Sequence, residues 1–248
     1  MTSAWTAEHV ARIAPGAGGL IPAVTGCQRA RGSLAAERLY WDMWPLQDAA
    51  GRQAVVAGRE LWMALTAPDR GDPGLRHFEA KIHWLERRDG TWLDHGPVLP
   101  EGSLPYEREW AGSALYHDGA VTLFFTAAGT AARTGGYQQE LWAASAPVGA
   151  DGWPMQWSAP APLVTGYGDH YMPADAHEGL PGAIKAFRDP AYFRDPADGS
   201  EWLAFTASLA GATSAFNGAF GLARKTPEGW VLARPCLDAE GVNNELER

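Results

Sequence analysis

The sequence is short of cysteine, of long apolar runs and of positive charge. Cys27 and Cys236 are too few for a disulfide framework, and neither lies in a CxxC or Cys/His cluster with zinc-site spacing, which favours two thiols over one bridge. No window approaches the roughly 18 apolar residues that span a membrane. Lys and Arg number 20 against 29 Asp and Glu, so nucleic acid and anionic membrane surfaces would be repelled.

Turn-forming residues and tryptophan are abundant instead. The 248 residues include 29 Gly, 18 Pro and 12 Trp, and this length suits one large domain. Short runs rich in β-forming residues recur between the turns, for example at 60–67 and 218–225. Asp-Gly and Asp-Pro sequences predict hairpin turns at 88–90, 117–119 and 195–199. These features predict an all-β protein.

The predicted strands fall into three similar sets, at about 38–93, 109–158 and 187–234. Such a period is typical of the blades of a β-propeller, although a two-sheet sandwich fits the strand pattern alone equally well. The segment 159–186 has no periodicity and is predicted to be a long loop. One short amphipathic helix is predicted at 6–13, with Thr6 as its N-cap.

Two acidic motifs are candidates for a site within the strand sets. Asp42 lies in the run YWDMWPL, where an isolated carboxylate is costly to bury unless it is hydrogen-bonded or functional; the alternative is a strand end before Pro45. The sequence FRDP occurs twice, at 187–190 and at 193–196. The second copy runs into the predicted hairpin turn, whereas the first opens a strand, so Asp189 is the candidate rather than Asp195.

A third acidic motif, NNELER, occupies 243–248. Residues i and i+2 of a strand face the same side, so a strand here would direct Glu245 and Glu247 into one pocket. A further polar cluster lies in the long loop, but its spacing matches no standard set of metal ligands, so no metal is predicted; it comprises Asp169, His170, Asp175, His177 and Glu178.

Four segments, in this order, resemble the motifs of the levansucrase/inulosucrase family, glycoside hydrolase family 68. They are WDMWPLQ at 41–47, EWAGSA at 109–114, RDP at 188–190 and ELER at 245–248. The resemblance extends over about 37–248, and the order and spacing of the motifs make it specific. RDP alone would be weak evidence, since invertase-like and arabinanase-like propellers share it.

The resemblance implies a five-bladed β-propeller with a central funnel-shaped pocket for sucrose, of which about three blades are present. It divides the chain into an N-terminal segment at 1–36, with the short helix, and a partial propeller catalytic domain at 37–248. Because the strand sets stop as a fourth begins after Glu247, the chain is predicted to be C-terminally incomplete and inactive alone. Activity would then need roughly 100 further residues, about two blades.

Carried onto matching positions, the resemblance makes Asp42 the nucleophile, Asp189 the transition-state stabiliser and Glu247 the general acid/base. It assigns four residues to substrate binding: Trp41, Trp110, Arg188 and Glu245. Where some family members have Ser, this chain has Ala111. A hydrogen bond that helps to orient the nucleophile is therefore missing or replaced by water.

The implied activity is levansucrase-type transfer of fructosyl from sucrose to fructan or water, by a retaining double displacement and without a cofactor. The alternatives are a β-fructofuranosidase, an inulosucrase and a catalytically inactive sugar-binding propeller. The expected partners are sucrose and fructan acceptors, not nucleic acid or membrane. The N-terminus lacks the basic start and apolar centre of a secretory signal. Secretion by an unrecognised route is therefore expected, with cytoplasmic residence as the alternative.

Overall fold

The computed structural model describes residues 2–13, 34–100, 105–129, 136–174 and 185–246. Within these ranges regular structure is almost entirely β-strand, as predicted, and no helix is long and apolar enough to cross a membrane. Helix α1 (Ala7–Ile13) follows Thr6, whose hydroxyl accepts a hydrogen bond from the His9 N–H at 3.4 Å, so the predicted N-cap is confirmed. A 3-10 helix, η2 (Pro73–Phe78), was not predicted.

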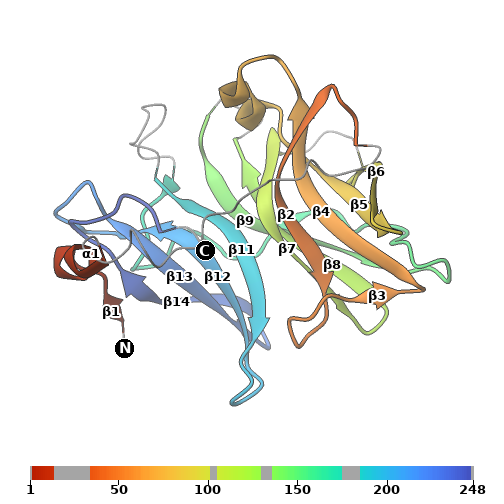
Figure 1. Cartoon of the computed structure of the whole chain (residues 1–248). Coiled ribbons are helices and arrows are strands. Elements are labelled where there is room, and N and C mark those ends of the chain that lie inside the picture. The colour runs from red at the N-terminus through yellow and green to blue at the C-terminus, as the bar shows by residue number, and fades with distance from the viewer. Residues whose placement is uncertain (1, 14–33, 101–104, 130–135, 175–184, 247–248) are drawn as a thin grey trace.

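The strands form three blades that succeed one another along the chain, and neighbours within a blade are antiparallel except at the outer edge of the third (Figure 1). Blade 1 contains β2 (Arg38–Gln47), β4 (Arg59–Pro68), β5 (Lys81–Arg88) and β6 (Thr91–Pro97), with β3 (Val55–Val56) beside β4. Blade 2 contains β7 (Arg108–His117), β8 (Ala120–Ala128), β9 (Gln139–Pro147) and β10 (Ala161–Pro162). Blade 3 contains β11 (Phe187–Arg194), β12 (Glu201–Ser208), β13 (Gly218–Thr226), β14 (Gly229–Asp238) and β1 (Ser3–Ala4).

All three predicted hairpin turns are present. The φ angle is 49° at Asp89 and 75° at Gly90 in the first turn, and 48° at Asp118 and 74° at Gly119 in the second. Two consecutive positive φ values are the signature of a type I′ turn, whose twist matches that of the strands it joins. In the third turn the Asp195 carboxylate accepts a hydrogen bond from the Ala197 N–H at 2.8 Å. Local side-chain chemistry therefore sets these strand ends.

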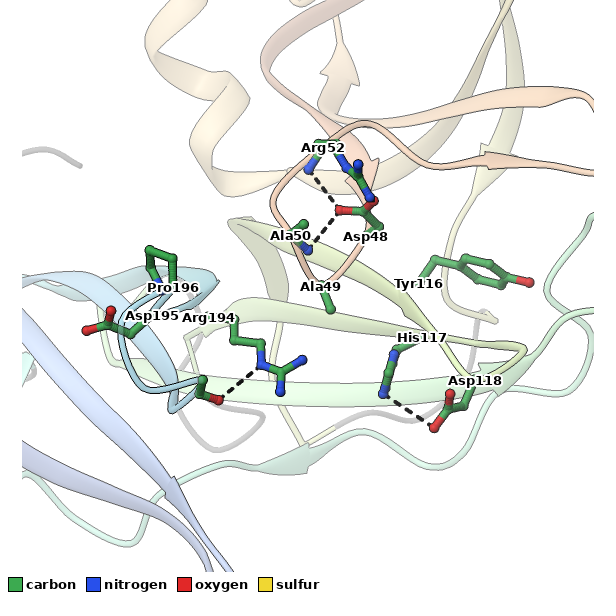
Figure 2. Close-up of a pocket in the computed structure, with 11 residues that line it drawn as sticks. Asp48, Ala49, Ala50, Arg52, Tyr116, His117, Asp118, Arg194, Asp195 and Pro196 are labelled. Carbon is green, nitrogen blue, oxygen red and sulfur yellow. Dashed lines mark hydrogen bonds and ion pairs between the residues drawn. The ribbon is translucent and has the colours of Figure 1, made fainter.

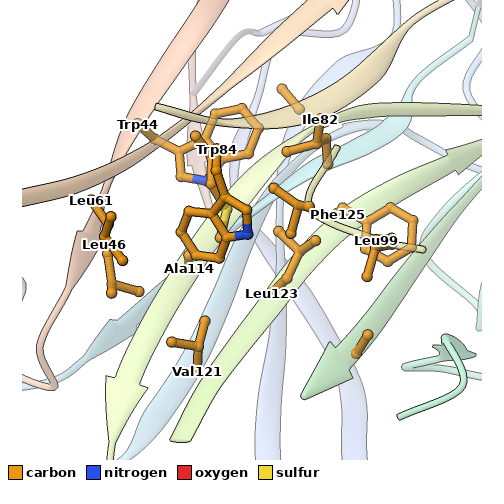
Figure 3. Close-up of a cluster of buried hydrophobic side chains, with 14 of the residues drawn as sticks. Trp44, Leu46, Leu61, Ile82, Trp84, Leu99, Ala114, Val121, Leu123 and Phe125 are labelled. Atoms are coloured by element: carbon orange, nitrogen blue, oxygen red, sulfur yellow. The ribbon is translucent and has the colours of Figure 1, made fainter. Parts of the chain in front are cut away.

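Apolar side chains between neighbouring blades form two cores. Blades 1 and 2 bury Trp44, Leu61, Ile82, Leu123 and Phe125 between them, each no more than 8% exposed (Figure 3). A second core fills the space between blades 2 and 3. Burying one such side chain contributes roughly 1.5–3 kcal/mol, so these contacts fix the blades relative to one another. The inner strands β2 and β7 also pair in parallel over two residues, Leu46 with Ala114 and Gln47 with Leu115.

The structure tests several local predictions and adds a strand that was not predicted. The N-terminal strand β1 pairs in parallel with β14, so the outer edge of blade 3 comes from the start of the chain. The segment 159–186 contains the short strand β10, and its residues 175–184 lie outside the described residues. Residues 243–246 are irregular rather than a strand. Cys236 is a free thiol, while Cys27 lies outside the described residues.

A polar network in blade 1 makes the free energy of unfolding depend on pH in the acid range. Asp94 accepts hydrogen bonds from the Tyr40 hydroxyl at 2.6 Å and the Gly96 N–H at 2.8 Å, and it contacts His83 Nδ1 at 2.9 Å. Burial opposes ionisation, but these bonds outweigh it and lower the pKa of Asp94 to about 2.

A folded-state pKa below the unfolded value means that ionised Asp94 stabilises the fold above roughly pH 4, and that this stability is lost as pH falls towards 2. We therefore expect Asp94→Asn to lower the free energy of unfolding at pH 6 and to flatten its decline between pH 4 and pH 2. Denaturant titrations at several pH values measure both. Parallel pH curves for the variant and wild type would contradict the prediction.

Candidate functional site

A hollow of about 570 Å³ lies where the inner strands β2, β7 and β11 come together. It collects six of the seven site residues predicted from the sequence: Trp41, Asp42, Trp110, Arg188, Asp189 and Glu245. The seventh, Glu247, lies outside the described residues. Leu65, Gly74, His77, Ala111 and Tyr137 complete the lining. Residues 204 positions apart in the sequence, Trp41 and Glu245, thus share one cavity.

Each inner strand carries a β-bulge at the hollow. The pairing of β2 shifts between Trp41 and Met43, which leaves Asp42 as the bulged residue. The pairing of β7 shifts across Ala111, and that of β11 shifts across Asp189 and the following proline. A bulge re-aims a side chain that regular pleating would direct elsewhere. All three bulges place a residue of the predicted motifs in the wall of the same cavity.

Both predicted catalytic aspartates have left-handed backbones. The φ angle is 46° at Asp42 and 60° at Asp189. This region costs a residue other than glycine on the order of 1–3 kcal/mol, although aspartate tolerates it better than most. Such strain is characteristic of functional sites, where the surrounding structure holds it in place. The Asp42 side chain is exposed to the cavity, whereas that of Asp189 is 13% exposed.

Arg188 joins two of the carboxylates. Its Nε lies 3.4 Å from Asp189 Oδ2, and its Nη2 lies 3.0 Å from Glu245 Oε2. The Arg188 side chain is 12% exposed, so these pairs are only partly screened by water. The guanidinium therefore ties strand β11 to the irregular segment that carries Glu245.

The segment at 243–246 is held by contacts with blade 3 rather than by strand pairing. Gly218 donates its N–H to the Asn243 carbonyl at 2.9 Å, and the buried Lys185 ammonium donates to Asn244 Oδ1 at 3.1 Å. A Cβ added at Gly218 would lie 2.9 Å from both Cα and N of Glu245, closer than real Cβ atoms approach. The close passage therefore requires glycine at 218.

The family resemblance assigns Glu245 to substrate binding, and on that role we expect Gly218→Ala to push Glu245 away from Arg188 and to weaken sucrose binding more than it lowers thermal stability. The Cβ would meet backbone atoms of the crossing segment, which cannot rotate away as a side chain could. A KM for sucrose raised roughly tenfold, the loss of about one charge-assisted hydrogen bond, is the expected result in steady-state kinetics of the full-length protein. An unchanged KM would show that Glu245 does not hold the substrate.

Aromatic rings form one wall of the hollow. The His77 ring meets Trp41 and Trp110 edge-on, with centroids 6.0 and 6.4 Å away, and the Trp110 indole N–H donates to the His77 carbonyl at 3.1 Å. Surrounding protein atoms and the Arg76 guanidinium lower the pKa of His77, which favours the neutral imidazole. His77 was not among the predicted site residues. It lies in η2, and no motif marks it.

Behind Trp110 the wall is stiffened by Arg108, which is 1% exposed. Its guanidinium carbon lies 5.5 Å from the ring centroids of Phe78 and Trp110 and 6.0 Å from that of Tyr137. Such cation–π contacts hold the rings in a fixed arrangement. The adjacent motif residue Glu109 is buried outside the hollow, where its carboxylate accepts the Ile82 N–H at 3.0 Å. Burial raises the pKa of Glu109.

A larger hollow, of about 740 Å³, lies at the other end of the inner strands, among the turns at 48–52, 117–119 and 195–199 (Figure 2). Its polar side chains contact nearby partners: Arg52 pairs with Asp48 at 2.8 Å, and His117 Nε2 lies 3.3 Å from Asp118 Oδ2. The Arg52 and Asp118 side chains are 78% and 88% exposed. These are solvated turn residues, and Asp195 lies among them, as predicted.

No group of three or more His, Cys, Asp or Glu side chains within the described ranges is arranged to hold a metal ion. The polar cluster in the loop at 159–186 is described only in part. Asp169 and His170 lie within the described residues, whereas Asp175, His177 and Glu178 lie outside them.

Comparison with known proteins identifies the family. A profile described as Levansucrase/Invertase, the glycoside hydrolase family 68 profile, matches residues 2–220. The chain belongs to this family. Its sequence is 26% identical to levansucrase of Erwinia amylovora over 260 residues, covering 87% of this chain and 60% of that protein. It is 27% identical to an extracellular sucrase of Zymomonas mobilis, covering 84% and 57%. The chain thus spans about 60% of the length of these curated relatives.

Solved structures agree with this assignment to the levansucrase/invertase family. An inulosucrase from Halalkalicoccus jeotgali, bound to kestose, superimposes with a TM-score of 0.83 at 36% identity, covering 100% of this chain and 64% of that one. Levansucrase of Bacillus subtilis superimposes with a TM-score of 0.82 at 19% identity, which shows the shared fold. Members of the family are five-bladed β-propellers, and the described residues form three blades of that fold. The predicted fold class is confirmed.

Proposed function

We propose that the protein cleaves sucrose with retention of configuration and transfers the fructosyl group to a growing fructan or to water. The observation that carries this proposal is the convergence of Asp42, Asp189 and Arg188 on one aromatic-walled hollow, with both aspartates on strained bulges. Membership of the levansucrase/invertase family supports it. The division into a segment at 1–36 and a catalytic domain from 37 onwards remains part of the proposal.

Retaining cleavage needs two carboxyl groups roughly 5–5.5 Å apart. In the proposed mechanism the Asp42 carboxylate attacks the anomeric carbon of the fructosyl unit and forms a covalent intermediate. Glu247, which follows the segment that brings Glu245 to the hollow, donates a proton to the departing glucose oxygen. The same residue then takes a proton from the acceptor hydroxyl, and the acceptor oxygen displaces Asp42.

The charge balance of the hollow favours this reaction. Asp42, Asp189 and Glu245 bring three carboxyl groups to the lining, and Arg188 is the one arginine among the residues that line it. The transition state carries positive charge on the sugar ring, so carboxylates fixed beside the ring stabilise it more than the neutral substrate. Asp189, held beside Arg188 at 3.4 Å, takes the role of stabiliser without forming a bond.

Substrate contacts are assigned from the same geometry. Trp41 and Trp110 offer flat apolar faces for the C–H side of a sugar ring, while Arg188 and Glu245 hold sugar hydroxyls. Ala111 places no hydroxyl beside Asp42, so the orientation of the nucleophile depends on its bulge. We propose an extracellular location, in line with the relative described as an extracellular sucrase.

Incubation of the full-length protein with sucrose tests the proposal. Glucose released in excess of fructose, with fructose-containing oligomers, is the expected result of transfer; equal amounts of the two monosaccharides would instead indicate a β-fructofuranosidase. The linkage of the oligomers separates levansucrase from inulosucrase. No glucose release at any pH from 4 to 8, with sucrose still bound, would overturn the proposal in favour of a sugar-binding protein.

A further inference from the structure

Strand β11 is the inner edge of blade 3, so half of its backbone hydrogen-bonding groups have no strand beside them. Such groups must find partners when they are buried. Here the partners are side chains from other blades. The Thr126 hydroxyl accepts the Asp189 N–H at 2.7 Å, and the Ser113 hydroxyl donates to the Pro190 carbonyl at 2.8 Å. Ser113 also accepts the Tyr192 N–H at 2.9 Å.

The same arrangement continues towards the start of β11. The Gln139 side chain donates to the Lys185 carbonyl at 2.9 Å and accepts the Phe187 N–H at 3.2 Å. Its Oε1 also lies 3.5 Å from Arg188 Nη1. Ser113, Thr126 and Gln139 are all buried, at 5%, 0% and 0% exposure, and all belong to blade 2. Three side chains of one blade therefore substitute for a paired strand along the site segment of the next.

Thr126 has a second contact that makes it the centre of this arrangement. While accepting the Asp189 N–H, its hydroxyl donates to the Ala111 carbonyl at 3.1 Å. Ala111 is the bulged residue of β7, and Asp189 lies in the bulge of β11. One hydroxyl thus joins two of the three bulges that line the hollow.

A threonine pairs with the residue directly before the bulge in blades 2 and 3, whereas Leu65 holds this place in blade 1. Thr126 pairs with Trp110 and Thr206 with Arg188, and both threonines are fully buried. The Thr206 hydroxyl has no hydrogen-bond partner among the described residues. Of these two threonines, only Thr126 accepts a hydrogen bond from the backbone of a bulged aspartate within the described residues. The contact, rather than the residue type, is what distinguishes Thr126.

We propose that Thr126, assisted by Ser113, is a positioning residue that holds the β11 bulge and keeps the Asp189 carboxylate in the hollow. The inference rests on the proposed function for its effect on catalysis. The left-handed backbone of Asp189, with φ of 60°, persists only while neighbouring bonds over-determine it. Losing the acceptor for its N–H lets the bulge relax, and displacement of a catalytic group by about 1 Å can cost on the order of 100-fold in rate.

The test compares Thr126→Val with Thr126→Ser in the full-length protein. Valine has nearly the same shape without the hydroxyl, whereas serine keeps it. We expect Thr126→Val to lower kcat for sucrose by roughly 10- to 100-fold with KM changed less than about threefold, and Thr126→Ser to restore most of the loss. Thr122→Val is the matched control, because Thr122 lies on the same strand and its exposed hydroxyl contacts Ser145 instead. It should leave kcat unchanged.

A second measurement reads the geometry without activity. Amide hydrogen exchange of Asp189, followed by NMR, should quicken at least tenfold in Thr126→Val and stay unchanged in Thr122→Val. If Thr126→Val does not fold, Ser113→Ala is measured instead. We expect the same loss of kcat, and amide exchange at Tyr192 should quicken at least tenfold. Equal kcat for Thr126→Val and wild type, equal impairment of the Val and Ser variants, or unchanged exchange at Asp189 would each overturn the inference. A wild-type protein that releases no glucose would contradict the proposed function, while the exchange measurement still decides the positioning role.

Discussion

Asp42→Asn is expected to remove sucrose turnover while leaving sucrose binding and the fold in place. The amide has the shape of the carboxylate and tolerates the left-handed backbone at φ 46°, but it cannot attack the anomeric carbon. Loss of a covalent nucleophile commonly costs three or more orders of magnitude in kcat. Glucose release by the purified full-length variant, with calorimetry to measure bound sucrose, gives both quantities.

Asp48→Asn is the matched control for this variant. Asp48 follows the same strand, but its carboxylate pairs with Arg52 at 2.8 Å in the larger hollow at the opposite end of the inner strands. Its substitution should leave kcat within about twofold of wild type. Residual activity of Asp42→Asn above about 1% of wild type would contradict the nucleophile assignment.

The second large effect distinguishes the two copies of FRDP. Asp189→Ala is expected to abolish turnover, and Asp195→Ala to be nearly silent. The first aspartate lies in the hollow beside Arg188, whereas the second caps a hairpin turn through the Ala197 N–H. Both variants are measured in one sucrose assay at equal concentrations of folded protein.

Alanine at 189 also changes the backbone strain, so Asp189→Asn separates the two effects. It keeps the shape and tolerates φ of 60°, yet removes the charge that stabilises a positive sugar ring. We expect it to be as inactive as the alanine variant. An inactive Asp195→Ala beside an active Asp189→Ala would show that the wrong copy had been assigned.

Features with a local cause were predictable from the sequence. The turns at 89–90 and 118–119 follow from Asp-Gly, which accepts two positive φ values, and the Thr6 cap follows from its hydroxyl. The two FRDP copies could be told apart because only the second continues into turn residues. The seven site residues were predicted because their motifs match those of the family in order, and six of them line one hollow.

Features with a long-range cause were missed. The segment at 243–246 is not a strand, and its place in the hollow depends on Gly218 and Lys185, distant in the sequence, rather than on a paired neighbour. His77 enters the site because η2 places it between two tryptophan rings. Nothing in the local sequence around Thr126 or Gln139 indicates which blade will face them.

The sequence by itself determined the all-β class, the three strand sets, the hairpin turns and the acidic motifs, since alternation of apolar residues and turn chemistry act over a few neighbours. Only the tertiary structure decided that the aspartates lie on left-handed bulges, that Glu245 reaches Arg188, and that side chains of blade 2 hydrogen-bond to the unpaired edge of β11. The reason is physical. A bulge persists, and an unpaired backbone group is satisfied, only through contacts between blades, and those contacts exist only once the blades have packed.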